Sequence, residues 1–432
     1  MNLFVGLIGI GGLLLLIMLR MPIGFAMAVT GLCGFGFMIS PVAGLSLLAK
    51  DIFNIFDSYA LSVVPLFVLM GQLCFNSGLG ERVYQATYKI LGRFPGGLTM
   101  ATIAGCAGFA SICGSTTATA ATMGTVSIPE MKKYKYDQAL ATGAVAAGGT
   151  LGILIPPSSV FIIYGIMTQQ SIGKLFFAGV IPGLILTGLF IISIYIICRV
   201  NPDLGPAGAP ATLREILRTL LGLGEAAVLF GLVMGGLFLG WFTPTEAGGI
   251  GAFGALALAV ITGRLTWKGF LLSFDQTIRI SCMIFIIIAG AVIFGRFLAV
   301  TRLPFELAAW VDGLALPPLL ILICILFIYL IGGCFMDSLA FMMLTISIFF
   351  PVVVRLGYDP IWFGVIIVIV TEIGAITPPV GINVFVISGV APDVPLQTIF
   401  KGISYFLGAF IVLLLLLICF PQLALLLPAL VG

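Results

Sequence analysis

A pattern of prolines, glycines and helix-capping residues occurs twice in this chain, at positions 115–157 and 337–379. The copies lie 222 residues apart without a gap, and each ends in a Pro-Pro pair that interrupts an apolar run. The matched positions are Ala118/Ala340, Pro129/Pro351, Tyr136-Asp137/Tyr358-Asp359, Gly152/Gly374 and Pro156-Pro157/Pro378-Pro379. Duplicated halves with matching interrupted helices are typical of secondary transporters, and the interruptions indicate where substrate binds.

The composition places the chain in a lipid bilayer. It is 61% hydrophobic and 8% charged, with a mean hydropathy of +1.27, whereas soluble domains are about 25% charged. Many apolar stretches reach the length of about 20 residues that a transmembrane helix needs. We therefore predict an all-α polytopic membrane protein. Its basic residues form no stripe, so we expect no nucleic acid partner.

The residue types that are absent exclude several kinds of chemistry. The chain has no histidine, which excludes histidine acid–base catalysis, histidine metal sites and histidine proton relays. The nine cysteines lie inside apolar segments, and we interpret them as small buried hydrophobic residues without a disulfide framework. The run Asn2–Leu19 lacks a basic start and a cleavage site, so we predict a retained first span.

The chain divides into two repeats of five spans each. We predict the first repeat at 1–200, a cytoplasmic linker with a short interfacial helix at 201–222, and the second repeat at 223–432. The predicted spans lie near 3–19, 22–40, 60–77, 137–168, 175–198, 223–241, 246–262, 279–299, 360–390 and 399–420. Two amphipathic segments, Glu81–Arg93 and Arg302–Asp312, are predicted to lie along opposite membrane surfaces.

Each repeat also contains an apolar stretch that small polar residues interrupt, at about 97–131 and 317–355. We predict re-entrant helical hairpins here, because non-helical backbone at this depth is tolerated only under protein or water. Five spans and one hairpin make an odd number of crossings, so the repeats must have inverted topology. With a periplasmic N-terminus, thirteen basic residues fall on the cytoplasmic side and four outside, as the positive-inside rule requires.

The Pro-Pro pairs create binding groups within the predicted discontinuous helices 137–168 and 360–390. Proline ends a helix, so preceding carbonyls become free for a cation. The restarted half-helix offers free amides and its positive end to an anion. The predicted substrate-binding residues are Thr116, Pro157, Ser158, Ser159, Asp337, Ser338, Pro379, Asn383 and Arg296.

Two cation sites are predicted where each interruption faces its hairpin. The inner site comprises Ser115, Thr116, Thr119, Gly152 and Ile155, and the outer site comprises Gly333, Asp337, Ser338, Gly374 and Thr377. These hard oxygen ligands suit an alkali cation such as sodium and do not suit a transition metal. A proton would require an intramembrane carboxylate, for which Asp337, Glu372 and Glu246 are the candidates.

Structural roles compete with these assignments. Small polar residues in membrane helices commonly serve packing and hydrogen bonding, but two copies in register favour a binding site. Glu246 could instead begin a helix, and Arg296 could pair with a carboxylate or attract an anion. Asp137 and Asp359 are expected to cap the spans that they precede.

At these residues the sequence resembles the large membrane subunit, of the DctM type, of tripartite ATP-independent periplasmic (TRAP) transporters. The resemblance covers essentially the whole chain. Its motifs are Pro65–Gly71, Ala118–Gly124, Leu140–Gly143, Gly152–Ser158, Ser171–Phe176, Phe242–Ala247 and Thr377–Gly381. One departure is visible, since the usual Ser-Ser of the first hairpin is Ser115-Thr116 here. Threonine keeps the hydroxyl group, so cation binding remains expected.

The resemblance implies properties that the residue pattern does not show. Such subunits lie in the bacterial inner membrane and work with a small DctQ-type membrane subunit and a periplasmic substrate-binding protein. They take up organic acids, such as C4-dicarboxylates, other carboxylates or sialic acids, coupled to sodium ions. Their fold is similar to that of the ion transporter superfamily, with an elevator motion of hairpins and broken helices against a scaffold.

Three other readings remain open on sequence. A stand-alone sodium/anion symporter with inverted repeats would need no binding protein. An intramembrane aspartyl protease would need two facing carboxylates, but Asp137 and Asp359 are predicted on opposite surfaces, so we do not expect an enzyme. A passive channel would conduct without saturation, whereas a carrier saturates.

Overall fold

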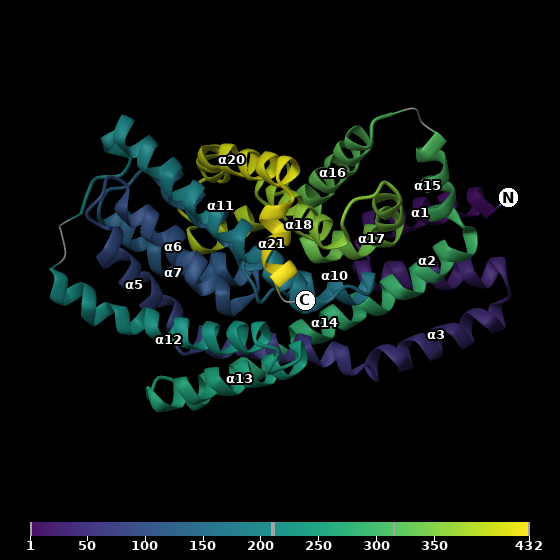
Figure 1. The fold of residues 1–432 in the computed structure, drawn as a ribbon, viewed down its shortest axis with the longest axis horizontal. Helices are drawn as coiled ribbons and strands as arrows, with labels where there is room; N and C mark the ends of the chain where they lie inside the picture. The colour runs from purple at the N-terminus through teal and green to yellow at the C-terminus, as the bar shows by residue number, and fades with distance from the viewer. Residues whose placement is uncertain (1, 209–211, 314–315, 431–432) are drawn as a thin grey trace.

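A computed structural model describes residues 2–208, 212–313 and 316–430, and every regular element in these ranges is a helix (Figure 1). Eight helices in the described ranges are long and apolar enough to cross a membrane, and further apolar helices are somewhat shorter. The prediction of an all-α polytopic membrane protein is confirmed.

The elements of the N-terminal half are α1 (Asn2–Met18), α2 (Ile23–Met38), α3 (Pro41–Phe56), the 3-10 turn η1 (Tyr59–Ser62), α4 (Val63–Asn76), α5 (Leu79–Leu91), α6 (Gly97–Cys113), α7 (Thr116–Lys133), α8 (Gln138–Gly149), α9 (Leu151–Leu154), α10 (Ser159–Thr168) and α11 (Ile172–Val200). The C-terminal half follows the turn η2 (Pro202–Leu204). Its helices are α12 (Leu213–Phe238), α13 (Pro244–Ile261), α14 (Trp267–Thr301), α15 (Leu303–Gly313), α16 (Pro318–Phe335), α17 (Ser338–Arg355), α18 (Pro360–Ile376), α19 (Ile382–Val390), α20 (Leu396–Cys419) and α21 (Gln422–Leu430).

Both discontinuous helices are present. The first break separates α9 from α10 at residues 155–158, and the second separates α18 from α19 at residues 377–381. Both Pro-Pro peptide bonds are cis. Asp137 accepts a hydrogen bond from the backbone amide of Leu140 at 2.9 Å, and Asp359 accepts one from Ile361 at 2.8 Å. These two aspartates therefore cap α8 and α18, as expected.

Several boundaries differ from the predictions. Helix α3 was not predicted, although the Ser40 side chain caps it by accepting from the Ala43 amide at 3.2 Å. Helix α12 runs without a break from Leu213 to Phe238, whereas a short helix at 213–220 and a separate helix from 223 were expected. A capping box of Thr212 and Glu215 begins this helix, and no proline follows to end it. Helix α14 extends well beyond the predicted span at 279–299.

Glycines allow some helices to pack very closely. A Cβ atom on Gly290 of α14 would lie 2.1 Å from the Gly24 carbonyl oxygen of α2, and one on Gly402 of α20 would lie 1.8 Å from the Ala139 oxygen of α8. Such close approach through small residues is typical of membrane helices. In Figure 1, α3, α12 and α13 run along the lower edge, α5, α6 and α7 lie at the left, α18 lies near the centre, and α16 and α17 lie right of centre.

We call α6–α7 the first hairpin and α16–α17 the second hairpin. Their tips are Gly114-Ser115 and Met336-Asp337. The long helix α14 packs on both α2 and α4, and α13 packs on α4. These four helices form one packed group beside the hairpins, and two of them, α4 and α14, contribute walls to the cavity described next.

Candidate functional site

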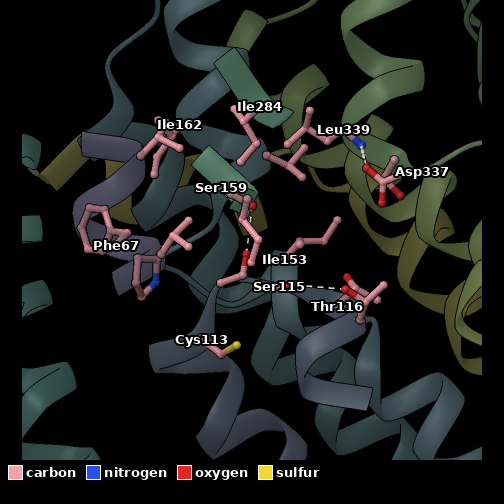
Figure 2. A pocket seen from close by; sticks show the side chains of 18 of the residues that line it. Phe67, Cys113, Ser115, Thr116, Ile153, Ser159, Ile162, Ile284, Asp337 and Leu339 are labelled. Carbon is pink, nitrogen blue, oxygen red and sulfur yellow. Dashed lines mark hydrogen bonds between the residues drawn. The ribbon is translucent and has the colours of Figure 1, made fainter. Parts of the chain in front are cut away.

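A cavity of about 170 Å³ lies where the two hairpin tips meet (Figure 2). Around the first break it is lined by Ile153 of α9, by Pro157 and by Ser159 of α10, and α4 and α14 contribute mainly apolar side chains. Six predicted site residues line it: Ser115, Thr116, Pro157, Ser159, Asp337 and Ser338. The structure thus brings together residues of both repeats at one place.

The first tip is fixed to the first break. Gly114 has a φ of 65°, and a Cβ atom there would lie 2.6 Å from the carbonyl oxygen of Pro157. The carbonyl oxygen of Gly114 accepts hydrogen bonds from the Ser159 hydroxyl at 3.0 Å and the Ser159 amide at 3.4 Å. Ser115 caps α7 by accepting from the Ala118 amide. The loop therefore requires glycine, and the start of α10 holds it in place.

The second tip repeats this arrangement with different side chains. Asp337 caps α17 by accepting from the Leu339 amide at 3.1 Å, as the dashed line beside Asp337 in Figure 2 shows. The amide of Gly381, the position matched to Ser159, donates to the Cys334 carbonyl oxygen at 3.3 Å. Each break is therefore attached to its own hairpin by the backbone amide at the same position of the repeat.

The predicted inner cation residues lie close together. A Cβ atom on Gly152 would lie 2.4 Å from the Ser115 carbonyl oxygen and 2.8 Å from the Thr119 hydroxyl oxygen. That hydroxyl donates to the Ser115 carbonyl oxygen at 2.8 Å. Ile155 follows in the same break, with its amide bonded to Leu151. Oxygen atoms of the first tip thus lie directly beside the break.

The predicted outer residues are grouped in the same way. A Cβ atom on Gly374 would lie 2.7 Å from the backbone carbon of Gly333, and one on Gly333 would lie 2.5 Å from the Thr371 carbonyl oxygen. The Thr377 hydroxyl lies 3.2 Å from the Cys334 thiol. Helix α18 therefore packs backbone against backbone on the second hairpin immediately before its break.

Glu372 connects the two hairpins. Its side chain is buried, at 3% exposure. One carboxylate oxygen accepts from the Ser338 hydroxyl at 2.6 Å, and the other accepts from the Thr116 hydroxyl at 3.1 Å. The sequence prediction considered Glu372 only as a proton-relay candidate and omitted it from the site. An acid within an apolar run was the available signal, but its partners lie 34 and 256 residues away.

The cavity is acidic. Asp337 and Glu372 line it, and none of the described residues that line it is a lysine or an arginine. Gln72 of α4 contributes a further polar side chain that the sequence prediction did not name. Ionised carboxylates on this wall would repel an organic anion unless cations offset their charge.

Four predicted substrate residues lie elsewhere than on the cavity wall. Arg296 pairs with Asp51 of α3 at 3.2 Å, so the structure favours the expected alternative of a carboxylate partner. Ser158 is buried and caps α10 by accepting from the Phe161 amide at 3.3 Å. Pro379 is exposed, and Asn383 is buried with an amide nitrogen that has no hydrogen-bond partner among the described residues. Glu246 begins α13 in a capping box with Thr243.

Comparison with known proteins identifies a family and several relatives that this chain resembles. The family model described as the DctM component of the tripartite ATP-independent periplasmic transporter matches residues 10–423. The C4-dicarboxylate TRAP transporter large permease protein DctM of Pseudomonas aeruginosa is 36% identical over 386 residues, covering 89% of this chain and 90% of that protein. The sialic acid TRAP transporter large permease protein SiaM of Vibrio cholerae is 33% identical over 421 residues, covering 97% of each.

The fold of this chain also resembles that of a solved structure. The YdaH transporter of Alcanivorax borkumensis, whose crystal structure is described as having an unusual topology, gives a TM-score of 0.61. The match covers 89% of this chain and 91% of that chain, at 14% identity. At this identity the likeness concerns the fold alone.

Proposed function

The chain belongs to the DctM family of large permease subunits of tripartite ATP-independent periplasmic transporters, and we propose that it takes up an organic acid anion together with sodium ions across the bacterial inner membrane. Proteins of this family are transporter permeases and not enzymes. The substrate class proposed is carboxylates or sialic acids, because relatives of this chain are named for C4-dicarboxylate and sialic acid.

One observation carries the coupling proposal. Both tips and both carboxylates, Asp337 and Glu372, meet at a cavity without a basic side chain among its described lining residues. Because like charges repel strongly where water is scarce, an anion enters favourably only with or after cations. The geometry therefore supports symport, with the cations as substrates that bind before or together with the anion.

We assign the sodium ions to the oxygen groups beside each break. The inner ion would lie near the Ser115 backbone, Thr116, Thr119 and the carbonyls of Gly152 and Ile155. The outer ion would lie near Asp337 and Ser338, and near the backbone of Gly333, Gly374 and Thr377. Hydroxyl, carboxylate and carbonyl oxygens are the ligands that hard cations prefer.

The anion would bind between these ions, at the start of α10. Ser159 and Pro157 line this wall, and the Ser159 hydroxyl, which donates to the Gly114 carbonyl oxygen in this structure, would turn to donate to the anion instead. The positive end of α10 would face the anion, although its first amide already donates to the Gly114 carbonyl oxygen. We do not assign Arg296 to the anion, because its guanidinium group pairs with Asp51.

The transport cycle proposed is an elevator motion. The moving part would comprise the hairpins and broken helices, and α2, α4, α13 and α14 would form the scaffold against which they move. We propose two repeats of inverted topology, 1–200 and 223–432, with the N-terminus in the periplasm. The partners proposed are a small DctQ-type membrane subunit and a periplasmic substrate-binding protein, in keeping with the tripartite organisation of the family.

Charge movement adds to the driving force. Each net positive charge that moves inward supplies about 2.3 kcal/mol per 100 mV of membrane potential. Two sodium ions with one monovalent anion would carry one such charge. Uptake should therefore increase when the vesicle interior is made negative.

The test is uptake of a panel of radiolabelled organic acids into vesicles that contain the purified membrane complex, with the substrate-loaded binding protein outside. An inward sodium gradient should drive accumulation, and replacing sodium with potassium should abolish it. Undiminished uptake without sodium would refute the coupling. Full uptake without the binding protein would indicate the stand-alone symporter instead.

A further inference from the structure

We propose that Glu372 couples the two sodium sites, so that an ion bound at one hairpin tip increases the sodium affinity of the other. This inference rests on the proposed function and adds a coupling role for one residue. It assigns Glu372 as a positioning residue that acts through Thr116 and Ser338, without itself contacting an ion.

The hydrogen bonds of Glu372 carry this inference. Its two carboxylate oxygens accept separately, one from Ser338 at 2.6 Å and one from Thr116 at 3.1 Å. Thr116 and Ser338 occupy matched positions of the two repeats, at the first residue of α7 and of α17. The Thr116 hydroxyl belongs to the proposed inner cation group, and the Ser338 hydroxyl belongs to the proposed outer one. A single buried carboxylate therefore contacts both groups.

The bonds also have the direction that coupling requires. A hydroxyl group that donates its hydrogen to Glu372 keeps its oxygen lone pairs free for a cation. An ion at one tip polarises that hydroxyl, strengthens its bond to the carboxylate and holds the carboxylate in place for the other hydroxyl. The other hydroxyl is then already oriented for the second ion, so less conformational entropy is lost when that ion binds.

The repeat itself shows that this carboxylate is a specialised feature. The position matched to Glu372 in the first half is Thr150, which follows α8 directly and whose hydroxyl donates to the carbonyl oxygen of Ala147 in that helix. The duplication thus supplies two tips and two breaks but one bridging carboxylate. Of the matched residues Thr150 and Glu372, Glu372 of α18 connects the two hairpin tips through its side chain.

The experiment measures sodium-dependent uptake by the full complex with its loaded binding protein. The wild type should show a sigmoidal dependence on sodium concentration. Glu372→Gln replaces one accepting oxygen with an amide that donates, so one hydroxyl still donates and the other must accept, which takes an oxygen lone pair away from the cation. Its Hill coefficient should fall towards about 1, the value for uncoupled sites. Its half-saturating sodium concentration should rise about tenfold, the equivalent of one charge-assisted hydrogen bond.

Matched variants separate coupling from general damage. Thr122→Val is the control, because the Thr122 hydroxyl donates to Ala118 within α7 and does not contact Glu372; its Hill coefficient should equal that of the wild type. Thr116→Val and Ser338→Ala each remove one partner. With Glu372 present, the change in half-saturating sodium concentration in the double variant should differ from the sum of the two single changes, each expressed as a free energy. In the Glu372→Gln background, the double variant should show the sum of the two single changes.

The experiment distinguishes failure of the coupling role from failure of the proposed function. Sodium-independent uptake by the wild type would refute the proposed function itself. A sigmoidal wild type with an unchanged Hill coefficient in Glu372→Gln, even at a lower maximal rate, would overturn the coupling role and leave the proposed function intact. If Glu372→Gln does not assemble, additive effects of Thr116→Val and Ser338→Ala in the wild type would likewise overturn it.

Discussion

Individual residues show why the first tip tolerates little change. Gly114 combines a left-handed backbone with a close approach to Pro157, while its carbonyl accepts two hydrogen bonds from Ser159. Conformation and space both require glycine there. Gly78, by contrast, has a φ of 72°, and no atom lies within 4 Å of the position that a Cβ atom would take, so only its conformation matters.

These two glycines allow a paired prediction. Gly78→Ala should lower the free energy of unfolding by about 1–2 kcal/mol, the cost of the left-handed conformation. Gly114→Ala should cost more, because the new Cβ atom meets the Pro157 oxygen, and it should also reduce uptake. Thermal unfolding of the purified complex and an uptake assay measure these effects. Equal stability of the two variants would contradict the steric account.

A pH prediction follows from Glu215, at the start of α12. Its carboxylate accepts from the Thr212 amide at 3.0 Å and lies 3.9 Å from the Lys89 amine, and these contacts lower the pKa of Glu215 from 4.5. The ionised form is favoured in the folded state, so its stabilising effect is present above pH 4.5 and is lost as the pH falls through the lowered pKa.

Glu215→Gln should therefore melt below the wild type at neutral pH, with the difference shrinking as the pH falls below 4.5. Melting curves of both proteins across this range provide the measurement. A difference that does not change with pH would show that the charge of Glu215 does not stabilise the helix start.

At the scale of helices, the contact between α8 and α20 depends on Gly402. We predict that Gly402→Ala destabilises the protein by about 1–3 kcal/mol, the usual cost of overpacking, because its Cβ atom would overlap the Ala139 carbonyl. Gly408 in the same helix faces open space, so Gly408→Ala should be neutral or stabilise by up to about 1 kcal/mol. Equal melting temperatures of these two variants would contradict the packing described.

Local signals decided which elements could be predicted from the sequence. Pro-Pro pairs end helices and aspartates begin them regardless of distant contacts, so the breaks and the caps Asp137 and Asp359 could be located. Helix α3 was missed because Lys50 and Asp51 lower its apolarity, although Ser40-Pro41 gives a start signal. The pairing of Asp51 with Arg296 joins residues 245 apart, and no local pattern predicts such a contact.

In the candidate site, too, the sequence identified the residues that carry a local signal and missed a contact between distant residues. The tip residues Ser115 and Asp337 were recognisable because the duplication marked them. The hydrogen bond from Thr116 to Glu372 could not be predicted, because it depends on how the two repeats pack against each other. A repeat pattern identifies equivalent residues, but it does not show which of them meet across the repeat interface.

At the scale of the whole molecule, the proposed inverted arrangement of the two repeats makes a topological prediction. Residues Lys133 and Val354 lie near the ends of the matched helices α7 and α17, and inverted repeats place them on opposite sides of the membrane. In a background without reactive cysteines, Lys133→Cys should resist an impermeant maleimide in intact spheroplasts and react after lysis. Val354→Cys should react in both. Labelling of both positions from one side would contradict inverted topology.

The most direct test of the central claim is equilibrium binding of radioactive sodium to the purified complex. The account predicts saturable binding of more than one ion for the wild type. Asp337→Asn should lose part of this binding, because it removes the charge at the second tip, and Asp393→Asn, at an exposed carboxylate paired with Lys132, should lose none. Absence of saturable binding, or equal binding by all three proteins, would contradict the claim that the hairpin tips and broken helices form the sodium sites.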